Sequence, residues 1–249
     1  MSWKDREKEA IERIKYLCPP EGFYVAYSGG KDSTVILDLV RRAGVPYDLH
    51  YNVTTVDPPE LVDFVRTQPE VQLHHPKESM WALIIKNLMP PTRFVRYCCR
   101  ALKEKGGANR VVLTGVRWEE SVKRSKRAMM ETCYRGPTKQ FLHAIIDWKE
   151  KDVWEYIRGR NLPYCCIYTK YKYSRLGCIL CPQQSAKGRQ RDAHIWPQYK
   201  KAYLNTFDKM LEYRLTMGKE NKDWKNAEAV YRWWLGQEET PLFPDEIFN

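Results

Sequence analysis

Short apolar segments alternate with longer amphipathic segments from Gly22 onward. This alternation predicts a parallel β-sheet covered by helices, because consecutive parallel strands are joined by a crossover that is usually helical. The expected strands are residues 23–28, 47–54, 71–75, 110–116 and 141–147, and the expected helices are residues 32–44, 58–67, 79–88 and 149–160. The sequence therefore predicts an α/β fold with a doubly wound, mostly parallel sheet.

The periodicity changes after Pro163. A loop rich in Tyr, Lys and Cys follows, and residues 189–249 carry Trp and Tyr at helical spacing before a tail with prolines. We expect a first domain over residues 1–188 and a helical C-terminal extension over residues 189–249 that lacks a full core of its own.

One glycine-rich segment, YSGGKDSTVI at residues 27–36, lies between the first expected strand and the first expected helix. Open α/β sheets bind ligands at such turns, beyond the carboxyl ends of their strands. Gly29 and Gly30 allow an anion to approach the backbone, and the helix N-terminus offers free N–H groups. Lys31 adds a charge that suits a polyphosphate, whereas Asp32 suits a helix cap or Mg²⁺. A turn that merely caps the helix is the alternative at this point.

The cysteines form a second group of candidate functional residues. The chain has eight: Cys18, Cys98, Cys99, Cys133, Cys165, Cys166, Cys178 and Cys181. The charged start of the chain predicts a cytoplasmic protein with reduced thiols rather than disulfides. Four thiolates from Cys98, Cys99, Cys178 and Cys181 would suit zinc or a 4Fe-4S cluster. Adjacent cysteines favour the cluster, since ordinary zinc knuckles separate their ligands.

Composition narrows the classes of function. The 249 residues include 42 Lys+Arg and 31 Asp+Glu, so the net charge of +11 favours a polyanionic partner. A hydrophobic share of 43% argues against disorder. No apolar run reaches the roughly 18 residues that a membrane span needs. Basic and aromatic residues after Lys149 favour a nucleic acid, although such aromatics more often form a core or a dimer face.

The glycine-rich segment resembles the pyrophosphate-binding loop of the ATP pyrophosphatase (PP-loop) superfamily. The superfamily pattern is SGGxDS, and this chain has SGGKDS at residues 28–33. Members of the superfamily cleave ATP between its α and β phosphates. The resemblance implies that the phosphates contact Ser28, Gly29, Gly30, Lys31, Asp32 and Ser33.

A wider resemblance, over about residues 23–185, is to the adenylylsulfate (APS) reductases within the phosphoadenylylsulfate (PAPS) reductase family. It is carried by RYCCRALKE, LTGVRWEESVKR, IIDWKEKDVWEYIRGRNLPY and YKYSRLGCILCP. It implies that Cys98, Cys99, Cys178 and Cys181 ligate a 4Fe-4S cluster. Arg117 and Arg124 are expected to bind a sulfate, phosphate or sulfur-bearing group. The expected nucleotide contacts are completed by Thr54 and Gly115.

Two departures from the family pattern bear on the reaction. Sulfonucleotide reductases carry a C-terminal cysteine in a motif like ECGIH, but no cysteine follows Cys181 here. A nucleophilic thiol would then come from elsewhere, and Cys165 and Cys166 are the favoured catalytic candidates. The reductases also have a degenerate phosphate loop, whereas the loop of this chain is complete. This combination resembles the DNA phosphorothioation branch of the family and, more distantly, the cluster-bearing tRNA thiolases.

The leading hypothesis is an ATP-dependent enzyme that adenylates a nucleic acid, DNA or tRNA, releases pyrophosphate and inserts sulfur. It would use ATP with Mg²⁺, with Lys31 and Asp32 as catalytic residues. A cysteine desulfurase or a thioredoxin-like reductant would supply sulfur or electrons, and a homodimer is a further expectation. The alternatives are an APS or PAPS reductase that produces sulfite and a nucleotide-binding iron–sulfur protein without enzymatic activity.

Overall fold

The chain forms two compact units, and its computed structural model describes residues 2–133, 138–219 and 224–236. The first unit comprises residues 1–53, 58–75 and 105–176, and the second comprises residues 54–57, 76–104 and 177–249. The boundary expected at residue 188 does not coincide with this division. The reason is that the C-terminal helices do not pack only on one another, because α10 (Pro197–Thr216) also packs on α4 (Met80–Asn87).

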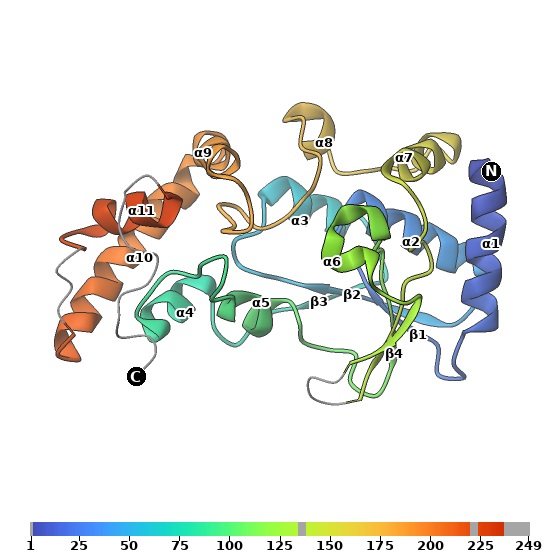
Figure 1. The fold of residues 1–249 in the computed structure, drawn as a ribbon, viewed down its shortest axis with the longest axis horizontal. Coiled ribbons are helices and arrows are strands. Elements are labelled where there is room, and N and C mark those ends of the chain that lie inside the picture. The colour runs from blue at the N-terminus through green and yellow to red at the C-terminus, as the bar shows by residue number, and fades with distance from the viewer. Residues whose placement is uncertain (1, 134–137, 220–223, 237–249) are drawn as a thin grey trace. The chain divides into compact units, whose positions relative to one another are not determined.

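The first unit is built on a six-stranded sheet in the order β3-β2-β1-β4-β6-β5. Figure 1 labels four of these strands, β1 to β4. The strands are β1 (Phe23–Ala26), β2 (Tyr47–Asn52), β3 (Val71–His74), β4 (Val111–Leu113), β5 (Met130–Thr132) and β6 (Gln140–Leu142). All neighbours pair in parallel except β5, which runs antiparallel to β6. The predicted α/β fold with a mostly parallel sheet is confirmed, and β5 at the sheet edge is an addition to it.

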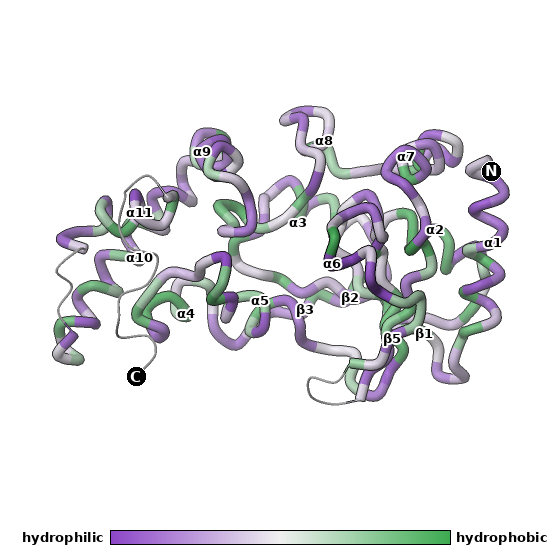
Figure 2. The backbone as a smooth tube through the Cα atoms, viewed as in Figure 1, coloured by the Kyte–Doolittle hydropathy of each residue, from purple (hydrophilic) through white to green (hydrophobic). Residues whose placement is uncertain are grey.

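The helical segments of the first unit are α1 (Trp3–Tyr16), α2 (Lys31–Ala43), α3 (Pro59–Arg66), η1 (Trp118–Glu120), α6 (Val122–Ser125), α7 (Glu150–Gly159) and α8 (Ile167–Lys170). Helices α1, α2 and α7 pack against one another. Glu7 of α1 is buried among them and forms ion pairs with Arg42 and Arg160. The sequence pattern did not predict α1, because this largely hydrophilic helix buries only Glu7, Ala10 and Ile14 (Figure 2).

Helix α2 connects the core of the first unit to the loop that precedes it. Its Val35, Ile36 and Leu39 are fully buried. The helix ends as predicted at Gly44, whose φ of 66° lies in the left-handed region that closes helices. Strand β1 lies between β2 and β4, where the order of the strands reverses. The loop between β1 and α2 therefore opens at the topological switch point, the usual ligand site of such sheets.

The second unit is helical, with α4, α5 (Tyr97–Leu102), α9 (Ala186–Ile195), α10 and α11 (Ala227–Leu235). Aromatic rings form much of its core: Trp234 lies 4.8 Å from Tyr203 and 5.6 Å from Phe207, measured between ring centroids. Buried Arg189 donates to the carbonyls of Trp234 and Leu235 at the end of α11. These aromatics therefore belong to a core. Among the described residues, no helix combines the length and apolar character that a membrane span requires.

Candidate nucleotide site and cysteine group

The backbone of the loop at residues 28–33 fits glycine at its second position. Gly29 has a φ of 69°, and a Cβ there would lie 2.6 Å from Leu61 Cδ1 and 2.8 Å from Val65 Cγ2 of α3. A larger side chain at this position would cause strain, because the backbone is left-handed and α3 approaches closely. Gly30 has an extended backbone and precedes the first residue of α2. The loop therefore presents backbone, not side chains, to its surroundings at these positions.

The two serines of the loop hold its shape. Ser33 Oγ donates to the Gly30 carbonyl at 2.9 Å and accepts from the Ser28 N–H at 3.2 Å. Ser28 Oγ lies 3.1 Å from Ser33 Oγ and 3.4 Å from the Gly30 nitrogen. The expected phosphate-contact residues are thus brought together in one small turn at the N-terminus of α2, where the helix dipole favours an anion.

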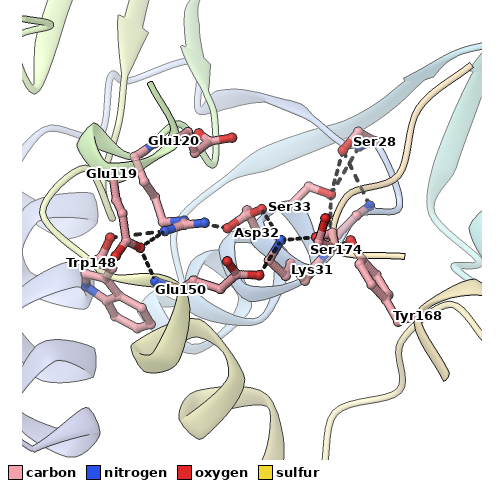
Figure 3. Close-up of polar contacts among 12 residues, drawn as sticks. Ser28, Lys31, Asp32, Ser33, Glu119, Glu120, Trp148, Glu150, Tyr168 and Ser174 are labelled. Carbon is pink, nitrogen blue, oxygen red and sulfur yellow. Dashed lines mark hydrogen bonds and ion pairs between the residues drawn. The ribbon is translucent and has the colours of Figure 1, made fainter. Parts of the chain in front are cut away.

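Lys31 is buried, with an exposure of only 4%. Its ammonium donates to the Ser174 carbonyl at 2.7 Å and lies 3.3 Å from Glu150 Oε1 and 3.8 Å from Asp32 Oδ2 (Figure 3). Its backbone N–H donates to the Tyr168 hydroxyl at 2.9 Å. Both the charge of Lys31 and its helix-terminal N–H are therefore engaged by groups of the same unit.

Arg117 supplies a second buried cation beside the loop. Its Nε donates to Asp32 Oδ1 at 2.6 Å, and its guanidinium also contacts Glu119 Oε2 at 3.1 Å. Gly115 allows this approach, because a Cβ at that position would lie 2.8 Å from the Asp32 carbonyl carbon. The structure thus places Gly115 and Arg117 beside the loop, and their expected contact with a nucleotide stays a prediction.

Arg124 has a different immediate partner. It forms an ion pair with Glu120, and Glu120 also accepts from the Arg117 N–H at 2.9 Å. Arg124 is therefore linked to Arg117 through Glu120, and its expected contact with an anion stays a prediction. Glu150, Tyr168 and Ser174 are site residues that the sequence did not indicate. The only local signal was the place of Glu150 at the start of a predicted helix.

The four cysteines predicted as cluster ligands all belong to the second unit. Cys98 and Cys99 lie in α5, and Cys178 and Cys181 lie between Gly177 and α9. Thr54, expected to contact the nucleotide, also belongs to this unit, and its hydroxyl oxygen lies 3.5 Å from Cys178 Sγ.

Charge interactions link the four thiols. A hydrogen bond with Cys99, burial, and the charges of Cys178 and Cys181 raise the pKa of Cys98. The hydrogen bond from Cys98, together with Arg96 at 3.3 Å, lowers the pKa of Cys99 to about 5. The charge of Cys178 raises the pKa of Lys103. Arg96 and Lys103 thus interact with the charges of this cysteine group.

These residues suit an iron–sulfur cluster in their chemistry. Four thiols are the usual donor set of a 4Fe-4S cluster, and Arg96 and Lys103 can offset its negative charge. Among the residues that the structure describes, no three His, Cys, Asp or Glu side chains come together closely enough to hold a metal ion. Ligation of a cluster by the four cysteines therefore stays a prediction.

The two cysteines proposed as nucleophiles differ in their surroundings. Cys165 is fully buried, and its Sγ lies 3.7 Å from the Glu60 carbonyl. Burial raises the pKa of its thiol to about 11. Cys166 is exposed. Because the thiolate is the reactive form, accessibility makes Cys166 the better candidate of the two.

A glycine-containing loop at the switch point of a parallel sheet, with buried cations beside it, defines a nucleotide-binding α/β protein. Residues 22–184 match the family model described as the phosphoadenosine phosphosulfate reductase domain. The chain belongs to this family and is an enzyme of that family.

Curated relatives agree with this assignment, and a solved structure has a similar fold. The chain is 26% identical over 209 residues to adenosine 5'-phosphosulfate reductase of Allochromatium vinosum, a match that covers 77% of this chain and 80% of the relative. The corresponding enzyme of Staphylococcus haemolyticus is 24% identical over 220 residues, covering 81% and 88%. The crystal structure of a PAPS reductase from Candida auris has a similar fold, with a TM-score of 0.53 at 19% identity over 71% of this chain and 93% of that one.

Proposed function

We propose that this protein binds ATP through residues 28–33, releases pyrophosphate and transfers sulfur to a nucleic-acid acceptor. The observation that carries the proposal is the buried ammonium of Lys31 at the start of α2, within a complete phosphate loop. A buried cation beside the N-terminus of a helix suits the β and γ phosphates of ATP better than a neutral turn does. Arg117 adds a second cation for the same phosphates.

The first chemical step is adenylation of the acceptor. An acceptor oxygen attacks the α phosphorus of ATP, the bond from that phosphorus to the bridging oxygen breaks, and pyrophosphate leaves with the electron pair. Lys31 and the N–H groups of the loop stabilise the charge that develops on pyrophosphate. Asp32 would exchange its contact with Arg117 for the Mg²⁺ that accompanies ATP, which frees Arg117 to contact a phosphate.

The second step replaces oxygen by sulfur. A hydrosulfide-class donor attacks the activated carbon or phosphorus, and AMP leaves with the acceptor oxygen, so the step needs no net oxidation. Cys98, Cys99, Cys178 and Cys181 would hold a 4Fe-4S cluster, which when bound would supply a binding site for sulfur or a path for electrons. Exposed lysines of α9 and α10 (Lys187, Lys201 and Lys209) would contact the phosphates of the acceptor.

Product analysis tests this proposal. The anaerobically prepared protein would be incubated with ATP, Mg²⁺, hydrosulfide and an oligonucleotide, and pyrophosphate and AMP would be measured. Release of both, dependent on the oligonucleotide and lost in Lys31→Met, is expected. Sulfite released from APS or PAPS with thioredoxin, without turnover of ATP, would contradict it. Tight binding of ATP without products for any acceptor would instead favour a non-enzymatic iron–sulfur partner.

Sulfonucleotide reduction is the second candidate function, favoured by the names of the curated relatives and by the exposed thiol of Cys166. Here Cys166 would attack the sulfur of APS or PAPS, AMP or adenosine bisphosphate would leave, and a thioredoxin-class dithiol would release sulfite. Cys166→Ser should then abolish sulfite production, while Cys165→Ser, at the neighbouring buried position, should retain it. Equal sulfite production by the wild type and Cys166→Ser would exclude this thiol as the nucleophile.

A further inference from the structure

A short segment of the first unit engages the donor groups of the phosphate loop. Residues 167–176, which we name the strap, comprise α8 and the chain that follows it. The Tyr168 hydroxyl accepts from the Lys31 N–H at 2.9 Å, and the Ser174 carbonyl accepts from the Lys31 ammonium at 2.7 Å (Figure 3). A Cβ on Gly30 would lie 3.5 Å from the same hydroxyl, so Tyr168 extends over the loop itself.

These contacts use the groups that a phosphate needs. The N–H at the first turn of α2 and the Lys31 ammonium are the strongest anion donors that the loop offers. Each already has an acceptor from the strap. Tyr168 is a neutral acceptor, because burial raises the pKa of its phenol. A phosphate oxygen carries charge and accepts a stronger hydrogen bond than a phenol does, so it can replace Tyr168.

The strap is held on its other side by α3 and by aromatic packing. The Tyr171 hydroxyl donates to Glu60 Oε1 at 2.9 Å, and Lys170 Nζ lies 4.0 Å from the same carboxylate. The Tyr168 ring packs on Trp154 at 5.2 Å between centroids. The strap contacts Lys31 through the Tyr168 hydroxyl, through the Tyr168 ring, whose centroid lies 5.7 Å from the ammonium, and through the Ser174 carbonyl. These contacts can break while Tyr171 and Lys170 stay anchored on Glu60.

We infer that the strap is an internal ligand of the phosphate loop, and that the phosphates of a bound nucleotide displace Tyr168 and the Ser174 carbonyl from Lys31. The inference rests on the proposed phosphate-binding role of the loop.

Affinity for pyrophosphate tests the displacement in the full-length protein. Tyr168→Phe keeps the ring but removes the oxygen that competes for the Lys31 N–H. Its dissociation constant for pyrophosphate, measured by titration calorimetry with Mg²⁺, should fall about fivefold relative to the wild type, as expected for one hydrogen bond. Tyr164→Phe is the matched control, because the Tyr164 ring also packs on Trp154, at 5.3 Å between centroids, and its affinity should not change. Weaker or unchanged binding by Tyr168→Phe would overturn the inference.

Hydrogen–deuterium exchange supplies a second measurement, and a simple loss of packing would not produce the result expected from it. Saturating pyrophosphate should slow exchange of the backbone N–H groups at the start of α2 and speed exchange of peptides covering residues 167–176. Slower exchange in both regions would overturn the inference, because the strap would then be a lasting part of the bound site. Failure of pyrophosphate to bind any of the proteins would overturn both the inference and the proposed function. Strap release without cleavage of ATP would contradict the proposed function alone.

Discussion

The phosphate loop of the first unit and the cysteine group of the second unit represent two ways of building a site. The loop is six consecutive residues between β1 and α2, and its shape is fixed by Gly29, by the two serines and by the start of the helix. The cysteines come from two distant segments of the second unit, α5 and the chain after Gly177, and among the described residues no three His, Cys, Asp or Glu side chains come together closely enough to hold a metal ion. A motif of consecutive residues therefore predicts the geometry of its site. A motif whose residues are distant in sequence predicts only the chemistry that those residues suit.

The test of this contrast with the largest expected effect removes one cysteine. Cys178→Ser should lose the brown colour and the bound iron of anaerobically prepared protein, because the cluster needs all four thiolates. Affinity for pyrophosphate should remain near that of the wild type, since the loop is formed within the first unit. Iron analysis and titration calorimetry measure the two properties. Cys18→Ser is the control, and a colourless wild type with one tightly bound zinc would contradict the cluster.

A matched pair of glycine substitutions tests how far local backbone fixes the loop. Gly29→Ala should lower the free energy of unfolding by about 2–4 kcal/mol, from the left-handed φ and the clash with Leu61 and Val65. Gly30→Ala should cost less than about 1 kcal/mol, because its added Cβ meets only ordinary contacts at 3.4 and 3.5 Å. Urea unfolding of both variants measures the difference. Equal stabilities would show that the backbone of the loop adapts, and that its sequence does not define its shape.

The same contrast explains what the sequence could predict. The parallel strands and α2, α3, α4 and α7 followed from hydrophobic periodicity and from start and stop residues such as Gly44. Strand β5 and α5 are short and carry no clear period, so neither was predicted. Helix α1 was not predicted, because its charged residues interact with partners that are distant in sequence. One example is the ion pair of Glu7 with Arg160.

The residues of the candidate site also fall into two groups, those that the sequence indicated and those that it did not. The loop residues, Gly115 and Arg117 could be predicted, because family-like motifs mark them. Tyr168 and Ser174 could not, since they lie more than a hundred residues after Lys31 and meet it through the course of the strap. Glu150 approaches Lys31 only because α7 packs on α2. Contacts made by loops between elements depend on tertiary packing that local pattern does not encode.

Removing the buried charge of the loop should have a smaller but specific effect. Lys31→Met would leave Glu150 facing the phosphates without this cation, while Asp32 would keep its contact with Arg117. We expect the dissociation constant for pyrophosphate to rise about 10- to 100-fold, the range for a charged hydrogen bond. Titration calorimetry measures this change, and iron content should not change. Lys123→Met, at an exposed position of the same unit, is the control. Retained affinity in Lys31→Met would mean that the backbone of the loop binds the anion alone.

The smallest expected effect is a change in stability with pH, and we expect it in the first unit rather than in the second. His50 of β2 stacks on Tyr24, and its Nδ1 lies 2.8 Å from His74 Nε2 of β3. Burial, followed by the charge of His74, lowers the pKa of His50 from 6.5 to about 4. Between these values the unfolded chain binds more protons than the folded chain, so stability falls as the pH falls through this window.

Backbone exchange resolved by peptide would localise this pH effect. From pH 7 toward pH 4.5, exchange in β1–β3, corrected for the intrinsic pH dependence of amide exchange, should rise relative to exchange in α10 of the second unit. His50→Gln should flatten the response of the three strands, because it removes the titrating group while keeping a polar side chain. An unchanged response in His50→Gln would assign the acid sensitivity to other groups. An equal response in α10 would show that the two units unfold together, which would remove the basis for treating loop and cysteines as separately built sites.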